Sequence, residues 1–237
     1  GMTQTGKTTL LSEALGEIRR TGRKAIVLTP NARIAGQLKA QRGLECTSIY
    51  QHMYDRSRGA GEQPVDAELK RKSKSRVFPL KECIDPEDCV YLIDEAHLIG
   101  NDLYELEDGS RFGSGHLADD FVQYTSMASS ARQVVLFGDP CQLPRGRRDS
   151  MPLFGDFQRA RGLITTEENL TEMFEDASRA IPLANARRLA ESILSGQFAE
   201  LELETGDGFA ILTRADAAER AKVLFSGQLM DAWYIAD

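Results

Sequence analysis

Short apolar runs alternate along the chain with segments whose apolar residues recur at helical spacing. A short apolar run bounded by Gly, Pro or Asp is typical of a buried strand, whereas apolar residues three and four positions apart indicate an amphipathic helix. Strand patterns occur at Lys24–Thr29, Cys46–Ile49, Val90–Ile93 and Gln133–Phe137, and helical patterns at Thr9–Arg20, Asn31–Ala40 and His116–Met127. This alternation predicts an α/β fold in which helices flank a parallel sheet.

Two regions depart from the alternation and divide the chain. Residues 55–88 are polar and include the basic run Lys70–Arg76, so we interpret them as an insertion. The composition turns basic and polar at Arg145–Ser150, which indicates a nearby domain boundary. We therefore predict a first domain over 1–155 and a second, partial domain over 156–237. In the second domain the patterns predict helices over Asp176–Ser195 and Asp216–Gly227 and strands over Phe209–Leu212 and Ala232–Ala236.

The composition is that of an ordinary globular protein. Apolar residues make up 41% and charged residues 27% of the 237 residues, and no apolar run is long enough to span a membrane. The formal net charge of −7 means that any nucleic-acid contact should be a local track. The four cysteines form no C-x-x-C pair, and with three histidines no zinc site is expected. Free thiols fit a reducing, cytoplasmic location.

The first residues form the pattern Gly1-x4-Gly6-Lys7-Thr8, directly before a helical segment. Backbone N–H groups of a glycine-rich turn at a helix N-terminus bind phosphate oxygens. Lys7 would reach the β- and γ-phosphates of ATP, and the Thr8 hydroxyl would ligate Mg²⁺. The alternatives are a chance Gly-Lys-Thr in a loop, or a tag remnant at Gly1 and Met2 that would leave the rest of the motif intact. The expected nucleotide-binding residues are Gly1, Thr3, Gln4, Thr5, Gly6, Lys7, Thr8 and Thr9.

Two adjacent acids, Asp94 and Glu95, follow the apolar run Val90–Ile93. A carboxylate at the end of a strand beside a phosphate-binding loop suits a magnesium site, so Asp94 is expected to join Thr8 as a metal ligand. Glu95 would orient and deprotonate the attacking water. An exposed turn with two acids is the alternative.

A third strand end carries an amide. Gln142 lies in the segment Gly138–Pro144 after the run Gln133–Phe137. A neutral side chain near the phosphates would sense the γ-phosphate by hydrogen bonding and signal it to a neighbouring domain. The expected catalytic residues are therefore Lys7, Asp94, Glu95 and Gln142, although a plain strand-to-loop turn would also explain this segment.

Together these motifs resemble superfamily 1 helicases, on the branch with RecD-like and Dda-like enzymes and the Schlafen-related DNA/RNA helicase group. The similar segments are Leu28–Asn31 (motif Ia), Thr47–His52 (the T-x-H segment after it), Asp94–His97 (motif II), Gly138–Leu143 (motif III) and Arg111–Leu117 (a segment of Schlafen-related members). The resemblance covers most of residues 1–150. It implies two RecA-like domains with ATP between them and single-stranded nucleic acid across their tops. DNA is favoured over RNA as this partner, although the motifs do not decide between the two.

Beyond residue 150 the resemblance weakens. Leu170–Phe174 is similar to the start of motif IV, where the family places an arginine next, but this chain has Glu175. Arg179, Arg187 or Arg188 would have to act as the arginine finger instead. No segment resembles motifs V and VI, and the strand that feeds the phosphate-binding loop in such folds would precede Gly1. We therefore expect this chain to be a fragment of a longer protein, and we do not predict that it turns over ATP by itself.

The resulting hypothesis is an ATP-dependent nucleic-acid translocase or helicase. Its rivals are a PhoH-like single-domain ATPase, a P-loop kinase, and a nucleotide-dependent switch that binds without unwinding. Asp94, Glu95 and the sensor Gln142 favour water activation over the group transfer of a kinase. Oligomeric state is not predicted, and no membrane partner is expected.

Several side chains have both a functional and a structural interpretation. The Lys70–Arg76 run would contact phosphates of a bound strand or form a solvated loop. His97 would couple the ATP and nucleic-acid sites or simply be satisfied by a neighbour, while His52 and His116 are expected to be structural. The arginines Arg145, Arg147 and Arg148 and the aromatic residues Tyr50, Tyr54 and Phe112 would contact nucleic acid or serve as linker and core.

Overall fold

The chain forms two compact units, Gly1–Phe174 and Glu175–Asp237. The computed structural model describes residues 1–2, 4–57, 60–61, 76–172, 180–197, 202–206 and 209–226. The division differs from the expected boundary between residues 155 and 156. The reason is Phe157, which is buried in the core of the first unit, so the chain has not left that unit at residue 156.

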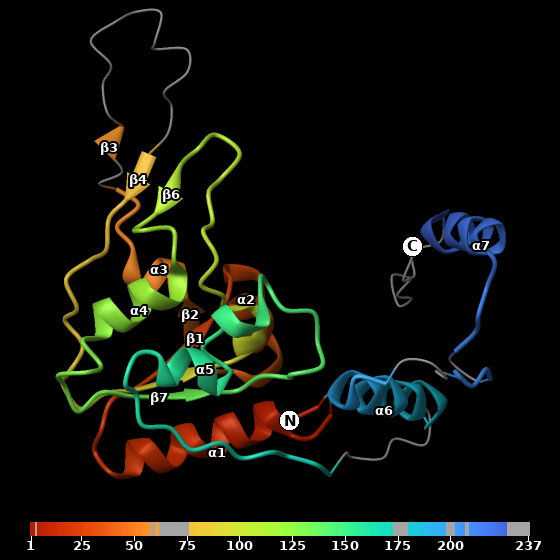
Figure 1. Cartoon of the computed structure of the whole chain (residues 1–237), viewed down its shortest axis with the longest axis horizontal. Helices are drawn as coiled ribbons and strands as arrows, with labels where there is room; N and C mark the ends of the chain where they lie inside the picture. Colours follow the sequence, from red (N-terminus) through yellow and green to blue (C-terminus); the bar gives the residue numbers. More distant parts are fainter. Residues whose placement is uncertain are drawn as a thin grey trace, which may run out of the picture. The chain divides into compact units, whose positions relative to one another are not determined.

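The order of elements follows the predicted alternation (Figure 1). The first unit contains α1 (Lys7–Arg20), β1 (Ala25–Thr29), α2 (Ala32–Arg42), β2 (Cys46–Ser48), α3 (Ile49–Met53), β3 (Ala60–Gly61), β4 (Arg76–Phe78), β5 (Val90–Ile93), the 3-10 turn η2 (Ala96–Leu98), β6 (Arg111–Phe112), α4 (Leu117–Thr125), β7 (Gln133–Leu136), the 3-10 turn η3 (Arg148–Ser150) and α5 (Gly155–Arg159). The second contains α6 (Ala180–Ser195) and α7 (Arg214–Ser226). Among the described helices, none is both long and apolar enough to cross a membrane.

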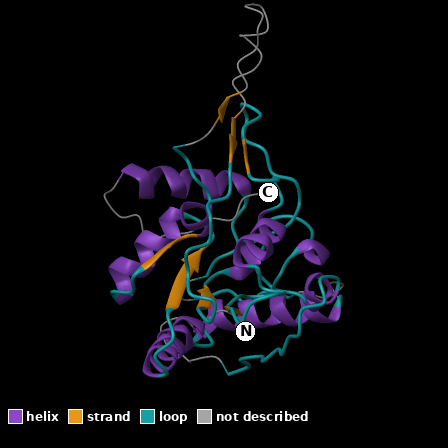
Figure 2. Ribbon diagram, turned by 90° about the vertical axis from the view of Figure 1, so that its left-hand side faces the viewer, coloured by secondary structure: helices purple, strands orange, loops and turns teal. Residues whose placement is uncertain are grey.

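The main sheet has four parallel strands in the order β2-β1-β5-β7. Figure 2 shows strands of the first unit with helices beside them. All four residues of β5 are buried, which explains why this strand is a continuous apolar run rather than an alternating one. β7 lies at the edge, and its Val135 is 39% exposed. The expected α/β fold with a RecA-like parallel sheet is therefore confirmed.

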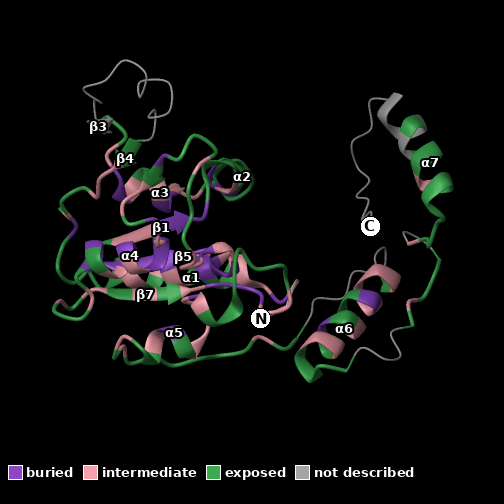
Figure 3. Ribbon diagram, turned by 45° about the horizontal axis from the view of Figure 1, so that its top comes forward, coloured by how far each residue is buried: buried purple, intermediate pink, exposed green. Residues whose placement is uncertain are grey.

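Helices cover both faces of this sheet because its strands send alternate side chains to opposite sides. Val27 and Leu92 pack with α1 and α2, whereas Leu28 and Ile93 pack with α3, α4 and α5. Figure 3 shows the buried residues concentrated in the strands and on the inner sides of these helices. Since parallel strands all end at one edge, the loops after β1, β5 and β7 open on the same side of the first unit.

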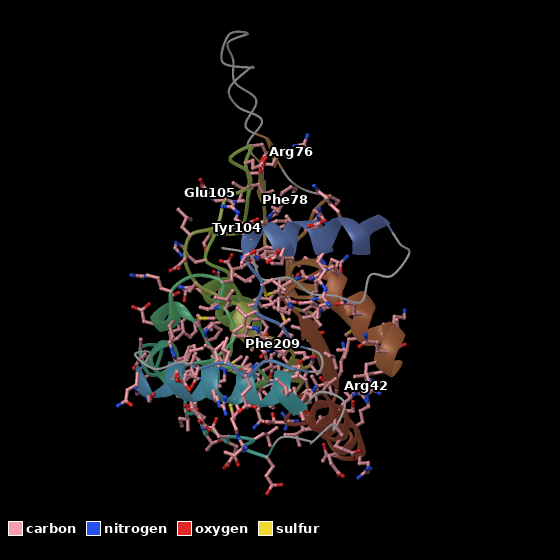
Figure 4. The ribbon with its side chains drawn as sticks, turned by 90° about the vertical axis from the view of Figure 1, so that its right-hand side faces the viewer. Arg42, Arg76, Phe78, Tyr104, Glu105 and Phe209 are labelled. Atoms are coloured by element: carbon pink, nitrogen blue, oxygen red, sulfur yellow. The ribbon has the colours of Figure 1, made fainter. Side chains whose placement is uncertain are left out.

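Two strands of the insertion, β3 and β4, form a second, smaller sheet with β6 in the order β3-β4-β6. Figure 4 places Arg76, Phe78, Tyr104 and Glu105 at the end of the first unit where this sheet projects. The ring of Phe78 stacks on that of Phe112 at 4.9 Å between centroids. The basic run Lys70–Arg76 lies outside the described residues except for Arg76 itself.

The segment Arg111–Leu117 wraps around a buried carboxylate at the start of α4. Tyr54 donates a hydrogen bond from its hydroxyl to Asp120 at 2.7 Å, and Ser114 donates from both its backbone N and its hydroxyl. Gly113 has φ +52°, and a Cβ there would come within 2.1 Å of Asp120 Oδ2, so the turn requires glycine. Tyr50, Tyr54 and Phe112 pack ring against ring around this turn, which supports their interpretation as core.

In the second unit, α6 is tied to the segment 202–206. Asn185 is buried and exchanges two hydrogen bonds with the backbone of Glu204, each of 2.8 Å. The predicted strand Phe209–Leu212 is wrong, because only Phe209 is bridged, to Gly206, and Ile211 is 64% exposed. The predicted strand Ala232–Ala236 lies outside the described residues. That this unit begins a second RecA-like domain stays a prediction.

A buried polar cluster around Asp85 joins the insertion to the sheet. The carboxylate of Asp85 accepts from Lys24 Nζ at 3.0 Å, from the Tyr91 hydroxyl at 3.0 Å and from His52 Nε2 at 2.8 Å. Burial alone would raise the pKa of Asp85, but the hydrogen bonds from Lys24, His52 and Tyr91 outweigh it, and the pKa lies below its ordinary 3.8. His52 therefore has a structural partner, as expected.

We predict that Asp85→Asn destabilises the first unit by about 2 kcal/mol at pH 7, since hydrogen bonds to a charged group are worth ~1.5–3 kcal/mol. Because the pKa is lowered in the folded state, this stabilisation is complete above the ordinary pKa of 3.8 and is lost as pH falls through the folded value. Urea unfolding at pH 7 and at pH 3 should show the difference from wild type shrinking at the lower pH. The exposed Asp88→Asn is the matched control, and an equal loss at both pH values would contradict the prediction.

Candidate nucleotide-binding site

The loop before α1 has the conformation of an anion-binding turn. Gly6 is the N-cap of α1 with φ 82° and ψ 17°, a left-handed backbone that suits glycine. Gly6 has no side chain to accept from the first-turn N–H groups, and no acidic residue stands in that turn. Unsatisfied N–H groups and the positive end of the helix dipole therefore face the loop, which is the arrangement that binds phosphate.

The other residues of the loop pack tightly around this turn. Gln4 has φ 61°, and the buried Thr5 donates from its hydroxyl to the carbonyl of Met2 at 2.7 Å. The nitrogen of Gly1 donates to the carbonyl of Gly138, beyond β7, at 3.1 Å. The sequence-predicted residue Thr3 lies outside the described residues. Thr8 and Thr9 occupy the first turn of α1, with Thr8 half-buried and Thr9 exposed.

Lys7 folds back over the loop. Its ammonium donates to the carbonyls of Gly1 at 2.9 Å and Met2 at 2.6 Å, and its Nζ lies 3.8 Å from Asp139 Oδ2. The carbonyls of Gly1 and Met2 carry only partial charges, so they are weak partners for a desolvated cation. The more highly charged phosphates of a nucleotide would replace them.

Asp94 and Glu95 stand at the carboxyl end of β5, as the sequence predicts. The Asp94 side chain is buried, and its Oδ1 accepts from the backbone N of Glu95 at 3.0 Å. Burial raises the pKa of Asp94, the charge of Glu95 adds to the rise, and Lys7 opposes it. Burial likewise raises the pKa of Glu95, again opposed by Lys7. Both carboxylates therefore lie within the electrostatic reach of Lys7.

Glu95 has two further features that suit a reacting group. Its backbone is left-handed at φ 51°, a strained conformation for a residue with a side chain, and such strain concentrates at functional sites. Among the described residues, its Oε2 is a buried side-chain oxygen without a hydrogen-bond donor. His97 Nδ1 lies 3.4 Å away, but that nitrogen already accepts from the backbone N of Asp139. The orphaned oxygen therefore suits a water or a cation.

His97 is buried and joins the ends of β5 and β7. Its Nδ1 accepts from Asp139 N at 3.3 Å, so the proton of the neutral ring is on Nε2. Burial lowers the pKa of His97, and the charge of Asp139 and, to a smaller extent, a hydrogen bond with Gln142 oppose the shift. The predicted γ-phosphate sensor Gln142 donates from Nε2 to Asp139 Oδ2 at 3.3 Å. His97 is thus placed between the motif II and motif III segments and is satisfied by them.

The residues present fit a nucleotide with its Mg²⁺ ion. Thr8 and Asp94 would hold the metal, and the orphaned Glu95 oxygen would be satisfied by water beside it. Within the described part of the chain, no three His, Cys, Asp or Glu side chains gather closely enough to hold a metal ion by themselves. Mg²⁺ does not need such a cage, because it keeps waters and takes substrate phosphates as ligands.

The residues at and near the expected arginine-finger position belong to the second unit. Glu175 and Arg179 lie outside the described residues, and the alternatives Arg187 and Arg188 form ion pairs with Glu191 and Glu204 in the second unit. His116 bonds to the carbonyl of Asn101 through Nδ1 at 2.7 Å, which is a structural role. Leu170, at the start of the segment similar to motif IV, lies against the loop, since a Cβ on Gly1 would meet its Cβ at 2.7 Å.

Sequence reasoning missed one member of the site, Asp139. The residue is 2% exposed, and its side chain contacts Lys7, Gln142 and the backbone of Cys141. A signal was available, because Asp139 follows a predicted buried strand in the same way as Asp94. In this segment the sequence argument selects the amide of Gln142 and passes over Asp139.

Part of the chain is similar to known proteins. Residues 1–106 match the family model described as an AAA domain. A solved structure reported as showing DNA unwinding at forked double-stranded DNA by two coordinating Pif1 helicases matches with a TM-score of 0.45 and 16% identity. The alignment covers 96% of this chain and 53% of that one, so this chain spans about half the length of the solved protein. No curated protein matches the chain.

Proposed function

We propose that this chain, whose first unit has the fold and phosphate-binding motifs of helicase-like P-loop NTPases, is part of an ATP-dependent nucleic-acid translocase or helicase. The observation that carries the proposal is the convergence of two strand ends, those of β5 and β7, on Lys7 in the loop before α1. Lys7 lies 3.8 Å from Asp139 after β7 and acts electrostatically on Asp94 and Glu95 after β5. A cation, the buried Asp94, the half-buried Glu95 and an amide around an anion-binding turn suit hydrolysis of a nucleoside triphosphate.

Each side chain then has a distinct role. The N–H groups at the start of α1 and the ammonium of Lys7 would bind and neutralise the β- and γ-phosphates. Glu95, whose pKa is raised by burial, would take the proton of the attacking water. Gln142 would contact the γ-phosphate, and an arginine from the second domain would complete the charge stabilisation. Mg²⁺, held by Thr8 and Asp94, would supply further neutralisation of phosphate charge.

Coupling between the γ-phosphate site and a bound nucleic-acid strand is supported by the segment that follows Gln142. Arg145 donates from its backbone to the carbonyl of His97 at 3.4 Å, and its guanidinium lies 4.1 Å from the ring centre of Tyr104. A movement of Gln142 on binding the γ-phosphate would therefore displace a cationic and aromatic surface at the same edge of the sheet. Single-stranded DNA is the partner that we propose for this surface.

The test is the ATPase rate of the chain with and without single-stranded DNA or RNA. We expect stimulation of at least about tenfold by DNA, since ordering of the motif III segment would couple strand binding to hydrolysis. Single-stranded RNA of the same sequence and duplex DNA are the comparisons. Tight nucleotide binding with an ATPase rate that neither DNA nor RNA changes would favour the binding switch. A phosphorylated product other than inorganic phosphate would favour a kinase.

A further inference from the structure

A carboxylate that the hydrolytic roles leave unused faces the phosphate-binding loop from the end of β7. Asp139 is 2% exposed, although it follows an edge strand and precedes an exposed loop. Burying a carboxylate is costly unless it is paired and hydrogen-bonded, so its contacts indicate what it is there to do.

Those contacts connect three parts of the site. Its Oδ1 accepts from the backbone N of Cys141 at 2.9 Å, which closes the turn after β7. Its Oδ2 accepts from Gln142 Nε2 at 3.3 Å and lies 3.8 Å from Lys7 Nζ. Its backbone N donates to His97 Nδ1 at 3.3 Å. One oxygen therefore faces both the phosphate-binding lysine and the amide sensor.

We propose that Asp139 is a positioning residue that holds Lys7 in the nucleotide-free site and orients Gln142 for the γ-phosphate. This inference rests on the proposed function. Without nucleotide, the carboxylate supplies the countercharge that keeps the desolvated ammonium in place. When phosphates arrive, they compete for Lys7 and are themselves repelled by Asp139, so the residue lowers nucleotide affinity. The hydrogen bond that Asp139 accepts from Gln142 Nε2 holds the amide of Gln142 in the orientation that distinguishes ATP from ADP.

The variant Asp139→Asn separates these effects from a purely structural role. Asparagine has the same shape and still accepts from the backbone of Cys141, so the turn is kept. It removes the negative charge beside Lys7 and places an amide beside Gln142. We expect the affinity for ADP with Mg²⁺ to rise about fivefold, since the ion pair of Lys7 with Asp139, with which the phosphates compete, is worth ~1 kcal/mol. The preference for a non-hydrolysable ATP analogue over ADP should fall towards one.

Calorimetric titration of both nucleotides into the whole chain measures these quantities, and thermal unfolding checks that each variant is folded. Gln142→Ala should lose the same preference without the gain in ADP affinity. The double variant should be no less selective than either single one, because two residues that act as a unit are non-additive. The exposed Asp88→Asn is the matched charge control and should bind both nucleotides as wild type does.

The outcomes separate this inference from the proposed function. A wild-type chain that binds neither nucleotide overturns both. A wild-type chain that binds, with Asp139→Asn indistinguishable from Asp88→Asn, overturns the positioning role alone. Weaker binding of both nucleotides by Asp139→Asn, or additive effects in the double variant, shows that the carboxylate only closes the turn and also overturns it.

Discussion

Replacing Glu95 by glutamine is expected to lower the rate of ATP hydrolysis by about 10²–10⁴-fold, the usual contribution of a positioned general base. Glutamine fills the same space but cannot accept a proton from water. The buried Oε2 that lacks a hydrogen-bond donor among the described residues is the atom expected to receive that proton. Burial, which raises the pKa of Glu95, brings its basicity closer to neutral pH and strengthens it for this task.

The same substitution should leave nucleotide binding intact, which separates chemistry from affinity. Removing a negative charge near the phosphates would at most tighten binding. Single-turnover hydrolysis and equilibrium titration on one preparation measure both quantities, in the presence of single-stranded DNA. Glu87→Gln, an exposed residue just before the start of β5 and therefore at the opposite end of the strand from Glu95, is the matched control. Equal losses of hydrolysis and affinity would mean that Glu95 supports the loop rather than acting on water.

The parts of the fold that local pattern determines were predictable. β1, β5 and α1 each have a signal contained in their own residues, because a strand buried on both faces must be apolar and an amphipathic helix must repeat its apolar positions. Elements that depend on distant partners were not. β6 is two residues long and exists because Arg111 and Phe112 pair with β4, which lies more than thirty positions earlier. No local pattern carries that pairing.

The converse error appears at Phe209–Leu212, where an apolar run predicts a strand that the structure does not contain. An apolar run becomes a strand only when a neighbour satisfies its backbone groups, and within the described residues this segment has only the bridge from Phe209 to Gly206. The first compact unit extends past the expected domain boundary for a related reason. The basic residues after motif III mark an exposed loop, but Phe157 returns the chain to the core of the first unit.

The candidate site was predicted in its elements but not in its internal contacts. The loop, the two acids and the amide each follow a strand or precede a helix, so topology alone brings them to one edge of the sheet. That the lysine rests beside Asp139, or that His97 accepts a hydrogen bond from the next strand end, depends on side-chain geometry that spacing does not encode.

Substituting Lys7 by alanine is expected to weaken nucleotide binding about 10- to 100-fold, since hydrogen bonds to charged groups are worth ~1.5–3 kcal/mol each. The reason is that Lys7 is the cation that the loop holds next to its anion-binding turn, with its ammonium on two backbone carbonyls that phosphates would displace. The loss should be larger for a non-hydrolysable ATP analogue than for ADP, because the ammonium would contact both the β- and the γ-phosphate.

Removal of Lys7 has a second consequence that a generally damaged loop would not produce. Lys7 opposes the rise in the pKa of both Asp94 and Glu95, so without it these carboxylates would become still harder to ionise. As the pH is lowered, magnesium-dependent nucleotide binding should therefore be lost at a higher pH in Lys7→Ala than in wild type. Titrations of ADP at several pH values test this, with Lys39→Ala, on the next helix, as the control. A uniform loss of affinity at every pH would show that Lys7 acts on the phosphates alone.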